Sequence, residues 1–154
     1  MSASRALSAP YQIQSAVAAD AGEVEALERM CFPAPWRREF FDSEIVAESR
    51  YNRVVKNNAR QVIGYLFSMY YLDEMHINKI AVRPPERRLG IATALMKDCT
   101  EFARSIGIRS ISLEVRQSNH NAQTFYHGLN FRALYNRPNY YPDGEAAVVM
   151  ALNL

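Results

Sequence analysis

The chain has 154 residues, a formal net charge of +2 and 49% hydrophobic residues. This length favours one domain with an apolar core, and the small net charge argues against nucleic-acid binding through bulk electrostatics. No apolar run approaches the roughly 18 residues that a membrane-spanning helix needs. We therefore expect a globular protein with neither a nucleic acid nor a membrane as its partner.

Hydrophobic periodicity and turn residues divide the chain into short elements. Asp20 and Glu23 have the spacing of a capping box, Asn57-Asn58 suits a hairpin turn, and Gly107 can end a helix. In chain order we expect a strand at 11–16, helices at 20–31 and 37–48, strands at 51–56, 61–71 and 74–82, a helix at 90–106, a strand at 110–115, a helix at 119–129, and strands at 131–137 and 146–152. This order predicts an α/β protein, with helices packed against an α+β mixed sheet.

Cysteine usage and the first residues bear on the compartment and the domain boundary. The two cysteines, Cys31 and Cys99, belong to no CxxC pair and no Cys/His cluster, so we expect no metal site. This composition fits a reducing compartment, and we expect a cytoplasmic protein. Residues 1–10 are small and polar and should form a flexible tail, which leaves residues 11–154 as the single domain.

The segment after the strand at 74–82 has the composition of an anion-binding loop. Its sequence is Arg87-Arg88-Leu89-Gly90-Ile91-Ala92, and a long amphipathic helix follows. The first N–H groups of a helix lack intrahelical partners and carry partial positive charge, and a glycine lets an anion approach the backbone. The dinucleotide fingerprint needs more glycines, and the P-loop needs Gly-Lys-Ser/Thr, so neither applies. Taken alone, the segment is either a phosphate-binding loop or a solvated turn.

Three further side chains could carry chemistry. Glu114 lies on the polar side of its strand, where it is either a functional carboxylate or a solvent-facing one paired with Arg116. Tyr126 is either functional or an aromatic side chain packed at a surface. His76 is either a base or an ordinary strand residue. The residues alone leave these alternatives open.

Together these motifs resemble the GNAT acetyltransferases, and in particular the RimI branch of Nα-acetyltransferases, which modify protein N-termini. The resemblance extends from Tyr11 to the C-terminus. It implies the GNAT fold, with a largely antiparallel sheet of about seven strands and about four helices. The segments that carry it are Phe32-Pro-x-Pro-Trp36, Ile80-Ala81-Val82, Arg87-x-x-Gly90-x-Ala92, Leu113-Glu-Val-Arg-x-x-Asn119, Phe125-Tyr126, Gly128-Leu-x-Phe131 and Asn139-Tyr140-Tyr141-Pro142.

The resemblance implies that acetyl-CoA is the cosubstrate and assigns a role to each motif. Glu114 would be the general base, acting through water, and Tyr126 would be the general acid. Asn119 would contact the cofactor. Main-chain groups of Ile80, Ala81 and Val82 would bind its pantetheine arm. The pyrophosphate would bind to backbone N–H groups of the loop formed by Arg87, Arg88, Leu89, Gly90, Ile91 and Ala92.

The acceptor is the remaining question. Trp36, Tyr140 and Tyr141 come from loops that either flank an incoming peptide or pack on the core. In the RimI family the acceptor is the N-terminal alanine of a small-subunit ribosomal protein, which makes a protein N-terminus the leading expectation. A small-molecule amine, for which Asp143 and Glu145 could supply charge, a lysine side chain, and a non-catalytic acyl-CoA-binding domain remain as alternatives.

Overall fold

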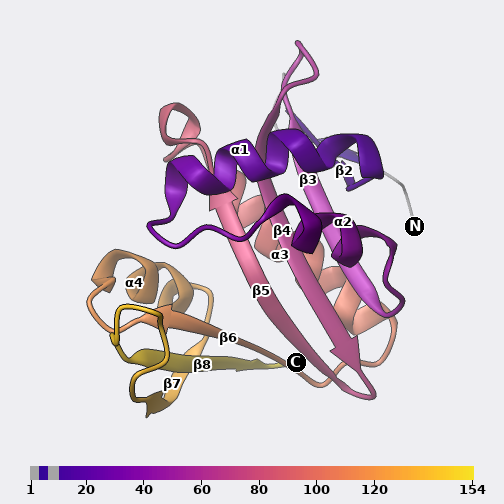
Figure 1. Ribbon diagram of the computed structural model, residues 1–154. Helices are drawn as coiled ribbons and strands as arrows, with labels where there is room; N and C mark the ends of the chain where they lie inside the picture. Colours follow the sequence, from indigo (N-terminus) through magenta and orange to yellow (C-terminus); the bar gives the residue numbers. More distant parts are fainter. Residues whose placement is uncertain (1–3, 7–10) are drawn as a thin grey trace.

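The computed structural model describes residues 4–6 and 11–154, which form one mixed sheet with helices on both faces (Figure 1). The sheet has eight strands in the order β1-β2-β3-β4-β5-β6-β8-β7, and only β5 and β6 are parallel neighbours among them. The strands are β1 (Ser4–Ala6), β2 (Gln12–Ser15), β3 (Arg50–Lys56), β4 (Val62–Tyr71), β5 (Glu74–Val82), β6 (Ser110–Arg116), β7 (Arg132–Arg137) and β8 (Ala147–Asn153). The α-helices are α1 (Ala21–Cys31), α2 (Arg38–Val46), α3 (Ile91–Ser105) and α4 (His120–Gly128).

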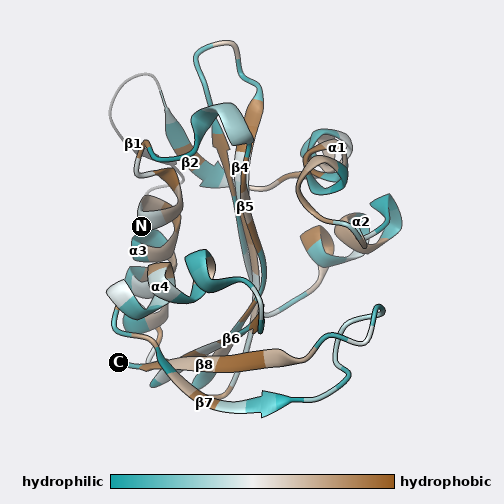
Figure 2. Cartoon of the chain, turned by 90° about the vertical axis from the view of Figure 1, so that its left-hand side faces the viewer, coloured by the Kyte–Doolittle hydropathy of each residue, from teal (hydrophilic) through white to brown (hydrophobic). Residues whose placement is uncertain are grey.

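Two layers of helices enclose the sheet. Figure 2 shows the sheet from its edge, with α1 and α2 on one face and α3 and α4 on the other. The larger core cluster lies on the α3 side, and the smaller one joins α1 and α2 to the opposite face. Both faces are therefore covered, as the expected mixed architecture requires. No helix in the described part of the chain is long and apolar enough to span a bilayer.

Helix α3 follows the predicted amphipathic pattern. Ile91, Leu95 and Cys99 are at most 2% exposed and face the sheet. Ile106, the last residue of the helix expected at 90–106, is 43% exposed, because the helix ends at Ser105 and Gly107 turns the chain in a left-handed conformation, with φ of +84°.

Strands β5 and β6 separate soon after they meet, and this separation positions the site. They pair only where residues 74–76 meet residues 110–112, after which β5 continues beside β4 and β6 beside β8 (Figure 1). A register shift between β4 and β5 pairs Phe67 with Lys79 but Ser68 with Ile77, so Asn78 is an extra, bulged residue. The sheet is therefore open between β5 and β6 beyond their short parallel contact.

Two local predictions at the start of the chain need correction. Within the expected tail, Ser4–Ala6 pairs with β2 as an eighth strand, and the rest of residues 1–10 lies outside the described residues. The capping box is absent from α1. Asp20 instead bonds the Val17 N–H at 2.9 Å and Lys56 at 2.8 Å, and Glu23 accepts from the Val62 N–H at 3.0 Å. Lys56 and Val62 are tertiary partners, whereas the bond to Val17 caps the short 3-10 helix at Ala18–Asp20 that precedes α1.

Candidate active site

A cavity of about 840 Å³ opens where β5 and β6 diverge. This volume is in the range of small-molecule and cofactor sites. Its walls come from both diverging strands, the start of α4, and two loops far apart in the sequence. The lining residues are Cys31, Phe32, Pro33, Ala34, Pro35, Trp36, Ile77, Asn78, Lys79, Ile80, Leu113, Glu114, Val115, Arg116, Asn119, Ala122, Tyr126, Tyr140, Tyr141 and Pro142.

Glu114 is a largely buried carboxylate of the cavity wall. Its side chain is 11% exposed, and its Oε1 lies 2.7 Å from His76 Nε2. Its Oε2 lies 3.7 Å from a guanidinium nitrogen of Arg137, and the Tyr140 hydroxyl donates to Oε1 at 3.5 Å. Burial raises the pKa of Glu114, but the hydrogen bond and charge of His76, with Arg137 and Tyr140, outweigh it and lower the pKa overall. Glu114 is therefore ionised at neutral pH.

The partner expected for Glu114 is bound elsewhere. Arg116 lies 2.8 Å from both Asp143 and Glu145, and its guanidinium stacks 4.2 Å from the centre of the Tyr141 ring. These contacts hold the loop before β8 against the end of β6. Of the two alternatives left open for Glu114, a solvent-facing carboxylate paired with Arg116 is not what the structure has, because neighbouring side chains on one face of a strand can each find nearer partners in other elements.

Tyr126 lies on α4 and lines the same cavity as Glu114. Its residue is 8% exposed, and its ring packs between Phe125 and Phe131, with centroid distances of 5.2 Å and 5.8 Å. Burial, together with the nearby Tyr141, raises the pKa of its hydroxyl above the ordinary value of a tyrosine. The hydroxyl thus carries its proton at neutral pH and is able to donate it.

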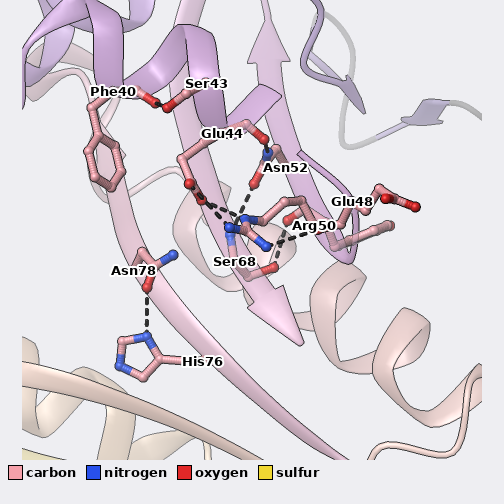
Figure 3. A network of polar contacts seen from close by, with 10 residues as sticks. Phe40, Ser43, Glu44, Glu48, Arg50, Asn52, Ser68, His76 and Asn78 are labelled. Carbon is pink, nitrogen blue, oxygen red and sulfur yellow. Dashed lines mark hydrogen bonds and ion pairs between the residues drawn. The ribbon is translucent and has the colours of Figure 1, made fainter. Parts of the chain in front are cut away.

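His76 connects Glu114 to the bulge in β5. Its Nδ1 lies 2.7 Å from Asn78 Oδ1, the contact drawn in Figure 3, and its Nε2 faces Glu114. Burial lowers the pKa of His76, but Glu114 and Asn78 raise it by more, so the net shift is upward.

Figure 3 also shows the contacts around Glu44, Arg50 and Asn52 that hold the end of α2 to the sheet.

The loop that precedes α3 has the backbone geometry of an anion cradle. Arg88 and Gly90 have φ of +67° and +81°, and Gly90 is the N-cap of α3. The first N–H groups of α3 have no partner within the helix. A side chain at Gly90 would have no neighbour within 4 Å, so the surface is open there. Ile91 is 2% exposed, so its side chain is not available to a ligand.

The guanidinium of Arg87 is bound within the protein. Its Nε donates to the Val82 carbonyl at 2.9 Å, and its NH2 lies 3.4 Å from Cys31 Sγ. The guanidinium therefore ties the loop to the end of β5 and to α1. Among the other expected cofactor residues, Ile80 and Asn119 line the cavity, whereas Ala81, Val82 and the loop at 87–92 lie outside its wall. Asn119 also caps α4, since its side chain accepts from the Ala122 N–H at 3.1 Å.

The left-handed Gly90 allows a stability test. Gly90→Ala should lower the free energy of unfolding by about 1 kcal/mol, because a Cβ is strained at positive φ. Gly128→Ala is the matched control, since its Cβ also meets nothing within 4 Å and its φ is not positive. The control should gain roughly 0.5 kcal/mol. Urea denaturation of both variants checks the opposite signs, and equal shifts would contradict the argument.

Comparison with known families decides the class of this site. Residues 22–131 match the model of the acetyltransferase (GNAT) family, which is more than half of the chain. The chain belongs to the GNAT acetyltransferases. Its fold class and its assignment as an N-acetyltransferase with RimI-like relatives are thereby confirmed.

Similar proteins include N-terminal acetyltransferases. The ribosomal protein bS18-alanine N-acetyltransferase of Escherichia coli is 32% identical over 129 residues, which cover 82% of this chain and 86% of that protein. The crystal structure of the Escherichia coli enzyme matches with a TM-score of 0.86 and 31% identity over 93% of each chain. An N-alpha-acetyltransferase of Sulfolobus acidocaldarius is 28% identical over 157 residues, covering 94% of this chain and 93% of that protein.

The aromatic residues expected on the acceptor side of this GNAT site all line the cavity. Trp36 packs on Phe40 at a centroid distance of 3.9 Å. Tyr140 and Tyr141 meet edge to face at 5.0 Å on the opposite loop. Each of these side chains packs against another aromatic ring and also lines the cavity. The two alternatives given for them, contact with a peptide and packing, are therefore compatible.

A buried ion pair that we had not predicted holds the Trp36 loop. Glu28 is fully buried and accepts from the Trp36 N–H at 3.0 Å, from Lys79 Nζ at 2.9 Å and from the Tyr65 hydroxyl. Lys79 Nζ also lies 4.0 Å from the centre of the Phe32 ring. The available signal was a charged residue one turn after Val24, on the apolar side of α1.

Within residues 4–6 and 11–154, no cluster of three or more His, Cys, Asp or Glu side chains could hold a metal ion.

Proposed function

We propose that this acetyltransferase transfers the acetyl group of acetyl-CoA to the N-terminal α-amino group of a protein. The observation that carries the proposal is that Glu114 and Tyr126 line one cavity, at the point where β5 and β6 separate. An ionised carboxylate and a protonated phenol supply a base and an acid to one reaction centre. The named activities of the similar proteins support the same reaction.

The residues present fit acetyl-CoA. When bound, this cosubstrate supplies an acetyl group as a thioester. We assign its pyrophosphate to the N-terminus of α3 and the loop of Arg87, Arg88, Leu89, Gly90, Ile91 and Ala92, where N–H groups are available. Ile80, Ala81, Val82 and Asn119 are assigned to the rest of the cofactor. The Val82 carbonyl also accepts from Arg87, which uses one of the two lone pairs of that oxygen.

Glu114 and Tyr126 take the two proton-transfer roles. Glu114 is the general base that removes a proton from the acceptor amine, and Tyr126 is the general acid that donates to the departing sulfur. Neutralising an α-amino group of pKa about 7.8 costs about 1 kcal/mol at pH 7, whereas a lysine of pKa about 10.4 costs roughly 4.6 kcal/mol. A carboxylate with a lowered pKa is a weak base, which favours the α-amino group over the lysine side chain.

The acceptor would enter between Trp36 on one loop and Tyr140 and Tyr141 on the other. Tyrosine hydroxyls can bond a peptide backbone while their rings bury apolar area. We take the N-terminal alanine of a small-subunit ribosomal protein as the leading acceptor. A ribosomal acceptor and two free cysteines, Cys31 and Cys99, fit the cytoplasm as the compartment.

The small cationic amine loses support as an acceptor. Asp143 and Glu145 could have attracted such an amine, but both are bound to Arg116 at 2.8 Å. A cationic small molecule would therefore meet no free carboxylate from the loop that carries Asp143 and Glu145.

The assay that tests the function uses the purified chain, acetyl-CoA and peptides that begin with Ala, Ser or Met. We expect transfer to the α-amino group, fastest for the Ala peptide, detected by peptide mass and by release of free CoA thiol. The control peptide has a blocked N-terminus and one internal lysine, and should remain unmodified. Transfer to none of the free N-termini, or faster transfer to the lysine, would overturn the proposal.

A further inference from the structure

His76 and Glu114 are close enough that they must share a proton. Nε2 and Oε1 are 2.7 Å apart, and Nδ1 lies 2.7 Å from Asn78 Oδ1. An amide oxygen only accepts, so Nδ1 carries a proton. A second proton lies between Nε2 and Oε1, because two lone pairs facing each other at this distance repel. The pair at rest therefore holds one proton that it can release.

The fold places the two side chains one behind the other. His76 is the last residue of β5 that pairs with β6, and its partner there is Ser112. Glu114 comes two residues after Ser112 on β6, so its side chain points to the same face of the strand. Glu114 lines the cavity, whereas His76 does not, and the His76 side chain is 32% exposed. The bulge at Asn78 brings its amide to His76 Nδ1. A proton that enters at Glu114 thus has a path through His76 toward solvent.

We infer that the base of this enzyme is the His76–Glu114 pair, with Asn78 holding the imidazole in the orientation that lets Nε2 receive a proton from the carboxylate. The ammonium of the acceptor loses one proton to Glu114, and Glu114 passes one proton to Nε2. The amine becomes neutral, Glu114 is again a carboxylate, and His76 becomes an imidazolium that releases the proton to solvent. This inference rests on the proposed transfer to an amine.

The charges around the pair determine the direction of its pH dependence. Arg137, from β7, opposes protonation of His76, and Tyr140 bonds Glu114, while Glu114 and Asn78 favour the imidazolium. The partners of His76 across the strands, Met69 and Ser112, are uncharged. The net effect is a raised pKa for His76. The pair accepts a proton only after it has lost one, so activity should fall as pH falls through this raised value.

The kinetic test compares wild type with His76→Gln on one peptide between pH 5.5 and 8.5. The ionisation of the peptide cancels in the ratio of the two kcat/KM values. We expect the ratio to rise with pH, through a midpoint above 6.5, to a plateau of roughly 10²-fold. Asn78→Ala keeps both groups of the pair and should move the midpoint to lower pH. His127→Gln, at an exposed position on α4, is the matched control and should follow wild type.

A second measurement needs no acetyl transfer. The chain has three histidines, so the ring signals of His76 can be assigned in an NMR titration by comparison with His76→Gln. Its midpoint should equal the kinetic one and fall in Glu114→Gln. A ratio that does not change with pH, or an NMR midpoint at or below 6.5, overturns the pair. If no peptide is acetylated while His76 titrates as described, the proposed function fails and the shared proton stands.

Discussion

Glu114→Gln lowers the kcat of peptide acetylation by roughly 10²–10⁴-fold, because an amide of the same shape cannot take the proton of the acceptor amine. The KM for acetyl-CoA should change little, since no backbone group of the α3 loop is affected. Initial rates at pH 8 are measured with the peptide varied at saturating acetyl-CoA, which gives kcat, and with acetyl-CoA varied at a fixed high peptide concentration, which gives its KM.

The control for this substitution is Glu74→Gln, an exposed carboxylate at the start of β5. It should retain wild-type rates. The folded state of Glu114→Gln should survive, because its partners His76 and Arg137 are 32% and 51% exposed and can be hydrated. Circular dichroism checks this point. A folded Glu114→Gln enzyme within about tenfold of wild-type kcat would remove Glu114 from the role of base.

Tyr126→Phe should lower kcat by about 10²-fold, the smaller end of the range for a general acid. The loss is limited because free thiols titrate near 8.5, so that the sulfur can also leave as an anion. Only the hydroxyl is removed, so the ring contacts with Phe125 and Phe131 should persist. Steady-state kinetics with varied acetyl-CoA should show the decrease in kcat with KM nearly unchanged.

Tyr135→Phe is the matched substitution on an exposed tyrosine of β7, which is 58% exposed. It should leave both constants at their wild-type values. If Tyr126→Phe has a normal kcat, or if only its KM rises, Tyr126 is part of the cavity wall and does not donate a proton in the slow step.

Several elements could be predicted because their signals are local. The stripe of Ile91, Leu95 and Cys99 predicts a helix wherever it packs, and α3 extends from Ile91 to Ser105. The alternation in β6 has the same local character, with its odd-numbered residues buried. The extra strand at Ser4–Ala6 was not foreseen, because its three residues carry no period of their own and it is defined by pairing with β2.

In the candidate site, too, the features with local sequence signals could be predicted and the contacts between elements could not. The motif resemblance brought Glu114 and Tyr126 forward, and the structure places both at one cavity. The motif resemblance does not predict that Arg116 binds Asp143 and Glu145, or that Arg87 bonds the Val82 carbonyl. Each of these contacts joins residues from different elements or across a turn. Side-chain pairing is a property of distances that the spacing along the chain does not determine.

The sequence by itself determined the class of fold, most of its elements and the family, since these depend on periodicity, turn residues and local motifs. Only the tertiary structure decided the state of the reactive groups. The short parallel contact between β5 and β6 brings His76 to Glu114, although 38 positions separate them, and the bulge adds Asn78. Burial and hydrogen bonding between these side chains shift both of their pKa values. Such shifts depend on separations of a few ångströms, which exist only once the sheet has formed.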